Sequence, residues 1–382
     1  MNKRPFIILS VFLLLFSLIE KGQATETYRP ETSVAGFIQL PGSGRQVYNF
    51  NPGWRFFRGD VQGAEAVNFD DRSWNVVSTP HTVELMPAEG SGCRNYQGPA
   101  WYRKHFVLPA ETKGKRVVLH FEAAMGKQIL YLNGKRIQEH LGGYLPFTLD
   151  LTANGVQAGD SCLLAVFTDN SDDKSYPPGK RQYTLDFAYH GGIYRDVWMI
   201  AKSPVAITDA IDSQIVGGGG VFVHFDKISK KSAQVYVNTE VQNDDARSES
   251  VTVETTLTDA DGKVIKRSSG KLSLKPGEKK SIRQQMEVKN PTLWSPDTPY
   301  LYRVQSRIKK GNKSIDGGIT RVGIRLAEFR GKDGFWLNGK PFGQLVGANR
   351  HQDFAYVGNA LPNSQQWRDA KRLRDAGCTI IR

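Results

Sequence analysis

The chain has 382 residues, of which 39% are hydrophobic and 23% charged, and its formal net charge is +13. This composition is ordinary for a soluble globular protein, and the length is sufficient for two or three domains. The basic residues are spread along the chain, with only short doublets such as Lys230-Lys231, and no nucleic-acid motif accompanies them. We therefore interpret the charge as a solvated basic surface and expect no nucleic-acid partner, with binding of a polyanion as the alternative.

The first 24 residues are predicted to be a secretory signal peptide. Two basic residues precede an almost wholly apolar run over residues 6–19, and the small residues Gly22 and Ala24 have the spacing that a signal peptidase requires. We expect cleavage after Ala24, a secreted or periplasmic location, and no membrane attachment after cleavage. The alternative is an uncleaved N-terminal anchor, although the apolar run is short for a membrane span.

The cysteine pattern predicts neither a disulfide framework nor a metal site. There are three cysteines, Cys93, Cys162 and Cys378, and no CxxC pair. A bridge between Cys93 and Cys162 is compatible with an oxidising compartment, but the sequence does not establish it.

Residues 25–203 are predicted to form one all-β domain. Short alternating runs recur, as in residues 117–121 and 128–132, and Asn133-Gly134 follows the second run. Asn-Gly is the strongest short signal for a β-hairpin. Many short strands at regular spacing predict a sandwich.

Residues 204–325 are predicted to form a second, smaller β-sandwich. Apolar residues alternate with polar ones in residues 235–241 and 251–257, and Asp261-Gly262 and Pro276-Gly277 supply turns. The length and the number of strands suit an immunoglobulin-like module.

Residues 326–382 have a different character. A small hairpin is predicted at residues 335–340, and buried strands are predicted at residues 344–349 and 378–382. A helix between these two strands makes the opening of a parallel βα fold, the unit from which a (β/α)₈ barrel is built. One such unit cannot close a barrel, so we expect the barrel to be incomplete.

The helix itself has clear start and stop signals. Asn363 or Ser364 can cap its N-terminus, and Gly377 can end it. Its apolar face consists of Trp367, Ala370, Leu373 and Ala376. Without further barrel elements this face and the strand edge stay uncovered, so we expect residues 326–382 to be poorly protected.

Several strings of residues, taken in order, resemble glycoside hydrolase family 2. They are Gly98-Pro99-Ala100-Trp101-Tyr102-Arg103-Lys104, Tyr131-Leu132-Asn133-Gly134-Lys135, Gly142-Gly143-Tyr144-Leu145-Pro146-Phe147, Asp169-Asn170, Gly191-Gly192-Ile193-Tyr194-Arg195-Asp196-Val197, Leu293-Trp294-Ser295-Pro296 and Gly347-Ala348-Asn349-Arg350-His351-Gln352-Asp353. The resemblance covers essentially all of residues 45–382. It implies a mainly β chain, in which a jelly-roll sugar-binding domain precedes an immunoglobulin-like sandwich and the first βαβ unit of an incomplete (β/α)₈ barrel.

The resemblance also implies the reaction. Family members are retaining exo-β-glycosidases, in which one Glu protonates the leaving oxygen and a second attacks the anomeric carbon. Both Glu residues are expected on later barrel strands beyond residue 382, so the chain alone is predicted to be inactive. β-Galactosidase is the favoured activity. The alternatives are a carbohydrate-binding fragment made of the two sandwiches and a non-functional remnant.

Four residues are predicted to bind the sugar. The resemblance implies that Asn349 and His351 line the sugar pocket, and Asp353 can accept a hydrogen bond from a hydroxyl group. For His351 the alternative is that it only caps a loop. An Asp of the first domain is also implied. Asp169 is favoured over Asp172 and Asp173 because it directly follows a strand, whereas a solvated turn is the better interpretation of the other two.

The remaining expectations concern partners and cofactors. A carbohydrate, either a β-glycoside or an oligosaccharide, is the expected ligand, and a homo-oligomer is left open. Mg²⁺ or Na⁺ near the active site is implied by the family, but the sequence places no metal site.

Overall fold

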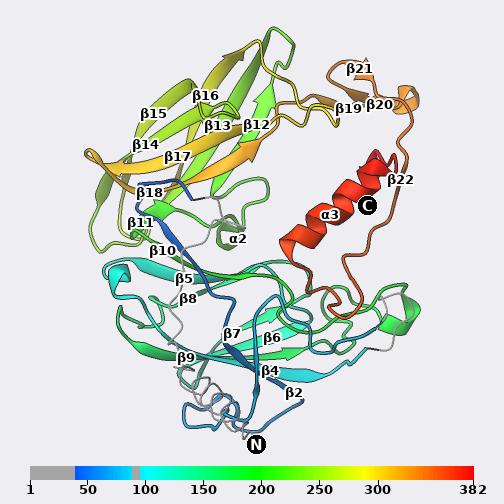
Figure 1. Cartoon of the computed structure of the whole chain (residues 1–382). Helices are drawn as coiled ribbons and strands as arrows, with labels where there is room; N and C mark the ends of the chain where they lie inside the picture. The colour runs from blue at the N-terminus through cyan, green and yellow to red at the C-terminus, as the bar shows by residue number, and fades with distance from the viewer. Residues whose placement is uncertain (1–38, 88–94) are drawn as a thin grey trace, which may run out of the picture.

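The computed structural model describes residues 39–87 and 95–382. The predicted signal peptide and Cys93 lie outside the described residues, so neither the cleavage after Ala24 nor the bridge to Cys162 is tested. Two β-sandwiches and a C-terminal segment follow one another along the chain (Figure 1). In the described part of the chain, no helix is both long and apolar enough to cross a membrane.

The first sandwich packs a six-stranded sheet, in the order β3-β2-β4-β9-β6-β7, against a four-stranded sheet, in the order β1-β10-β5-β8. The strands are β1 (Gln46–Asn49), β2 (Trp54–Arg58), β3 (Asn75–Val77), β4 (Pro99–Val107), β5 (Arg116–Phe121), β6 (Lys127–Leu132), β7 (Lys135–Leu141), β8 (Phe147–Asp150), β9 (Ser161–Asp169) and β10 (Val197–Lys202). The predicted hairpin is confirmed, because Asn133 and Gly134 join β6 to β7 with φ of 51° and 82°. Positive φ at both positions is what a two-residue hairpin turn of this twist requires.

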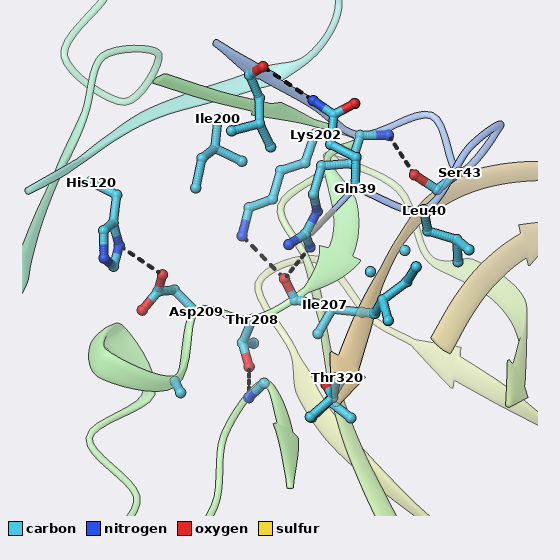
Figure 2. A pocket seen from close by; sticks show the side chains of 18 of the residues that line it. Gln39, Leu40, Ser43, His120, Ile200, Lys202, Ile207, Thr208, Asp209 and Thr320 are labelled. Carbon is cyan, nitrogen blue, oxygen red and sulfur yellow. Dashed lines mark hydrogen bonds and ion pairs between the residues drawn. The ribbon is translucent and has the colours of Figure 1, made fainter. Parts of the chain in front are cut away.

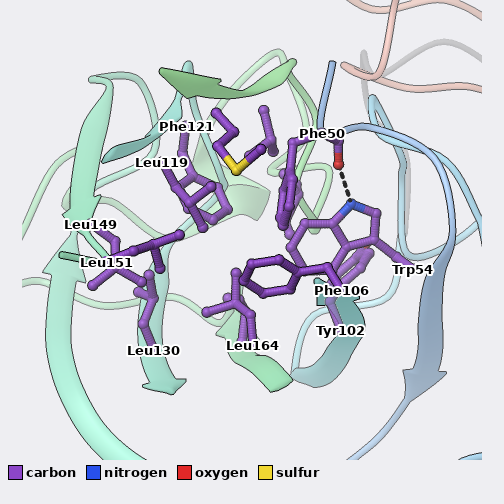
Figure 3. Close-up of a cluster of buried hydrophobic side chains, with 14 of the residues drawn as sticks. Phe50, Trp54, Tyr102, Phe106, Leu119, Phe121, Leu130, Leu149, Leu151 and Leu164 are labelled. Carbon is purple, nitrogen blue, oxygen red and sulfur yellow. Dashed lines mark hydrogen bonds between the residues drawn. The ribbon is translucent and has the colours of Figure 1, made fainter. Parts of the chain in front are cut away.

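Large aromatic and aliphatic side chains fill the space between these two sheets (Figure 3). Phe121 stacks on Phe147 with ring centroids 4.7 Å apart. The indole N–H of Trp54 donates to the carbonyl of Phe50 at 3.2 Å, so its one polar group is satisfied. Tyr102 is fully buried, so this aromatic residue of the first signature string belongs to the core.

The second sandwich pairs two four-stranded sheets. One has the order β11-β13-β12, with β16 also on β13, and the other has the order β15-β14-β17-β18. The strands are β11 (Val205–Ile207), β12 (Val221–Asp226), β13 (Ser232–Asn243), β14 (Glu249–Thr258), β15 (Val264–Leu274), β16 (Lys279–Lys289), β17 (Tyr302–Lys310) and β18 (Lys313–Val322), and the short helix α2 is Ala210–Ser213. The predicted period-2 pattern is confirmed, because alternate residues of β13 and β14 are buried.

The C-terminal segment contains a hairpin and one strand–helix–strand unit. The hairpin strands are β20 (Phe335–Leu337) and β21 (Lys340–Pro341), and β19 (Ala327–Phe329) pairs with β20. Strands β22 (Gly347–Ala348) and β23 (Ile380–Ile381) pair in parallel, and α3 (Asn363–Asp375) lies between them in the chain. Both strands were predicted to be buried, and this is wrong: they are short and exposed, because no further layer of the described residues covers them.

Helix α3 ends as predicted but begins differently. Gly377 has a φ of 88° and its N–H donates to the carbonyl of Arg374, while the N–H of Cys378 donates to that of Leu373. This is the Schellman arrangement that glycine favours. The residue at the N-cap is Pro362, and the Asn363 side chain donates to Asp196 of the first sandwich at 3.2 Å instead of capping the helix.

Candidate sugar-binding site

The residues that follow β22 line a cavity of about 340 Å³ at the boundary with the first sandwich. The cavity is lined by Tyr144, Asp186, Phe187, Ala188, Asn349, Arg350, His351, Gln352, Asp353, Asn359 and Arg382. Three of the four predicted sugar-binding residues, Asn349, His351 and Asp353, are therefore brought together. They come from the loop at the carboxyl end of β22, which is where βα folds place their active sites.

Two contacts join this loop to the segment between β9 and β10 of the first sandwich. The ring of His351 meets the ring of Phe187 edge-on, with centroids 5.1 Å apart and an angle of 88° between the planes. The carboxylate of Asp353 lies 3.7 Å from Nε2 of the buried His190. The first sandwich thus contacts two of the predicted sugar-binding side chains.

Arg350 supports the loop from the other side. Its guanidinium binds the Asp369 carboxylate of α3, with Nη2 2.5 Å from Oδ2. Its backbone N–H donates to the carbonyl of Arg382 at 2.9 Å. Because its charge is already paired with a carboxylate, Arg350 is an ion-pair partner within the segment.

The fourth predicted residue, Asp169, does not line this cavity. It ends β9, and its carboxylate accepts a hydrogen bond at 2.8 Å from the backbone N–H of Ser171. The carboxylate that the first sandwich contributes to the cavity is Asp186, which follows the short turn Gln182–Thr184. The only sequence feature that could have indicated Asp186 is its position five residues before the Gly191-Gly192 string, because its segment has no hydrophobic period.

A second, more polar cavity of about 450 Å³ adjoins the first, because Tyr144 and Gln352 line both. Arg195 of the first sandwich donates to Oε1 of Gln352 at 3.1 Å across this boundary. Burial raises the pKa of Glu122 in its wall, and burial also raises the pKa of Tyr144 to about 12. Tyr144 lines both cavities, and its protonated hydroxyl can act as a hydrogen-bond donor there.

A third cavity, of about 560 Å³, lies between the two sandwiches (Figure 2). Lys202 of β10 points into it and donates to the carbonyl of Ile207 at 3.1 Å, and burial lowers the pKa of this lysine to about 8. Arg45 forms a two-bond ion pair with the fully buried Asp316 of β18, at 2.7 and 2.8 Å. Asp316 also accepts from the N–H of Ile207 at 2.8 Å, so this cavity belongs to the junction that joins the sandwiches.

Among residues 39–87 and 95–382, no group of three or more His, Cys, Asp and Glu side chains could hold a metal ion. The first cavity, which we name the sugar-side cavity, offers hydrogen-bonding groups. Asp186 and Asp353 supply acceptors, and Asn349 and His351 supply both donors and acceptors, which is the set that sugar hydroxyls require. The lining residues include no glutamate.

Two family models match the chain and together cover more than half of it. The sugar binding domain of glycosyl hydrolases family 2 matches residues 57–204, and a further model of glycosyl hydrolases family 2 matches residues 219–325. The chain belongs to glycosyl hydrolase family 2, and it corresponds to the N-terminal portion of that family.

Relatives and solved structures agree with this assignment. A β-glucuronidase of Formosa agariphila is 32% identical over 90% of this chain, and a β-galactosidase of Thermoanaerobacter pseudethanolicus is 34% identical over 89%. The structure of β-glucuronidase 2 of Bacteroides uniformis, bound covalently to cyclophellitol-6-carboxylate aziridine, has a TM-score of 0.79 and 31% identity over 88% of this chain. The chain spans only 36%, 43% and 39% of these three proteins, respectively.

Proposed function

We propose that this chain is the sugar-binding front part of an exported, retaining exo-β-glycosidase whose two catalytic glutamates lie in barrel sequence outside the 382 residues. The observation that carries the proposal is the single cavity that joins Asp186 of the first sandwich to Asn349, His351 and Asp353. Its polar groups suit the hydroxyls of a terminal sugar, and the relatives named above are β-glucuronidases and β-galactosidases.

Between these two substrate classes, the charges of the cavity favour a neutral sugar. Two carboxylates and two guanidinium groups line it, and the guanidinium of Arg350 is already paired with Asp369, which leaves Arg382 as the second cation of the lining. A uronate would add a third negative charge to this lining, and repulsion from Asp186 and Asp353 would offset its attraction to Arg382. A β-galactoside is therefore the substrate that we propose.

The test is hydrolysis of aryl β-galactoside and aryl β-glucuronide by the 382-residue chain and by the full product of its gene. We expect no turnover by the 382 residues, and turnover of the galactoside by the full product. Turnover by the 382 residues alone would show that the catalytic carboxylates have been misplaced. A full product that cleaves only the glucuronide would overturn the choice of sugar.

A pair of matched variants tests the site itself. Asp186→Asn in the active full product removes a charged acceptor from the cavity, and we expect kcat/KM to fall about tenfold to a hundredfold. Asp169→Asn is the control, since that carboxylate lies at the end of β9 and does not line the cavity. An equal loss in both variants would contradict the assignment of Asp186.

The second candidate is a binding module without catalysis. It is favoured by one observation: both sandwiches contain buried cores of their own, whereas α3 buries none of its residues. Calorimetric titration of the 382-residue chain with galacto-oligosaccharides separates the two, because a binding module retains affinity without any barrel.

Export is the remaining part of the proposal. It is supported by the basic start, the apolar run over residues 6–19 and the small residues before Thr25. N-terminal sequencing of the protein recovered from the periplasm or the medium is expected to begin at Thr25. Recovery of uncleaved chain in the membrane fraction would favour an N-terminal anchor instead.

A further inference from the structure

The outward face of the sheet β15-β14-β17-β18 carries a net positive charge. The strand register and the burial pattern define this face, because inward residues of β14 such as Val251 and Val253 are buried, and those between them point outward. We name the cationic side chains on it the basic face; they are Arg267, Lys271, Arg303, Arg307, Lys309 and Arg321.

Only one carboxylate of this sheet shares the basic face. It is Glu254 of β14, whose carboxylate lies 3.4 Å from Nζ of Lys309. Among the described residues, no carboxylate forms an ion pair with Arg267, Lys271, Arg303 or Arg321 (the ion pairs of this sandwich involve other cations). All four of these side chains are exposed.

The opposite sheet of the same sandwich allows a comparison of the charges at outward positions. Its outward positions carry three cations, Lys279, Arg283 and Lys289, and three carboxylates, Asp226, Glu240 and Glu287. One sheet is therefore balanced and the other strongly basic. At the outward positions of the two sheets, the excess of positive charge therefore lies on one side, which uniform solvation does not require.

The register adds a second observation. Arg303 of β17 is directly opposite Arg321 of β18. Cross-strand partners have Cβ atoms about 5 Å apart, and like charges at this distance destabilise a sheet. An anionic group between the two guanidiniums would remove that repulsion, since each guanidinium can bind a carboxylate or sulfate through two N–H groups.

We propose that the basic face binds an anionic polysaccharide, whose carboxylate or sulfate groups lie over Arg303 and Arg321. The choice of a carbohydrate rests on the proposed function. It is also favoured by the face itself, which has no aromatic side chain among its outward residues on which bases could stack. A neutral β-linked branch on an acidic backbone would satisfy both this face and the sugar-side cavity.

The experiment measures binding of the 382-residue chain to four probes by calorimetry. Polygalacturonate oligosaccharides carry carboxylates, sulfated dextran oligosaccharides carry sulfates, galactan oligosaccharides are neutral, and poly-thymidine represents single-stranded nucleic acid. We expect binding to one or both anionic saccharides, and which one binds identifies the recognised group. Absence of binding to both, or tighter binding to poly-thymidine, would overturn the proposal.

Matched double variants locate the binding. Arg303→Gln with Arg321→Gln is expected to weaken binding about tenfold and to lower its salt dependence, because two screened contacts are lost. Lys279→Gln with Lys289→Gln removes the same charge from the opposite sheet and is expected to change affinity less than twofold by the same screening argument. Equal losses in both variants would show that only net charge matters.

A second double variant and a measurement of folding accompany this comparison. Arg303→Lys with Arg321→Lys retains the charge without the two-bond geometry, and we expect it to recover part of the affinity. Circular dichroism of each variant verifies the fold. Because binding is measured without hydrolysis, failure of this proposal is distinguishable from failure of the proposed glycosidase activity.

Discussion

The first sandwich and the C-terminal segment differ in how their secondary structure is stabilised. The sandwich places fully buried side chains such as Phe50, Phe121 and Leu164 between two sheets. Helix α3 has the cap and the length of an ordinary helix, yet none of its residues is buried, and Trp367 is 68% exposed. Local signals are thus sufficient to define a helix, whereas its stability depends on a packed apolar face.

Hydrogen exchange should show this contrast at its largest. Amides of β4 and β9, in the centre of the six-stranded sheet, are expected to exchange on the order of a thousandfold more slowly than those of α3, since they open only on global unfolding. Exchange followed by mass spectrometry resolves the two regions. Equal protection in α3 and β9 would mean that the C-terminal segment is stabilised by contacts that its exposure does not indicate.

Substitution of one large side chain in each region sharpens the comparison. Phe121→Ala opens a cavity beside Phe147 and should lower the free energy of unfolding by about 3–5 kcal/mol. Trp367→Ala removes an exposed ring and should change it by less than about 0.5 kcal/mol. Urea unfolding midpoints measure both. A cost for Trp367→Ala as large as that for Phe121→Ala would contradict the described packing of α3.

A smaller effect than that of Phe121→Ala is expected for a charge inside the first core. Lys104 of β4 is 1% exposed and donates to the carbonyl of Phe50, and burial lowers its pKa to about 7. The unfolded chain therefore binds more protons than the folded one between pH 7 and the ordinary lysine pKa of about 10.4. Stability should rise with pH in this window and fall as the pH drops toward 7, by about 2 kcal/mol between pH 9 and pH 7.

Lys104→Met should remove this contribution to the pH dependence of stability. The control is Lys113→Met, which removes an exposed ammonium from a turn and should leave the wild-type dependence unchanged. Urea unfolding of the three proteins at pH 7, 8 and 9 makes the comparison. Parallel pH profiles for wild type and Lys104→Met would refute the lowered pKa.

The sequence predicted most of the strands because their signals are local. Alternating burial and the Asn133-Gly134 turn are properties of a few adjacent residues. The exposure of β22 and β23 could not be predicted from local signals. An apolar run such as residues 378–382 indicates which side chains a strand could bury, but not whether other elements cover that strand. Burial is a property of neighbours that are distant in sequence.

The same limit explains the sugar-side cavity. Asn349, His351 and Asp353 could be grouped from the sequence because they follow one strand, and the structure places them in one cavity. Asp186 was not selected because the segment between β9 and β10 has no period, and the rule that a site residue follows a strand selected Asp169 instead. The one-sided charge of the second sandwich was also missed, since a count along the chain does not distinguish the two faces of a sheet.

The ion pair between Arg45 and Asp316 restricts how this protein can be recombined. Arg45 precedes the first strand of the first sandwich and Asp316 lies in the last strand of the second, so the two halves of the pair are encoded 271 positions apart. A chimaera that takes only one sandwich from another family member would bury a carboxylate or a guanidinium without its partner. Exchange of either domain therefore has to carry both residues, or replace both together.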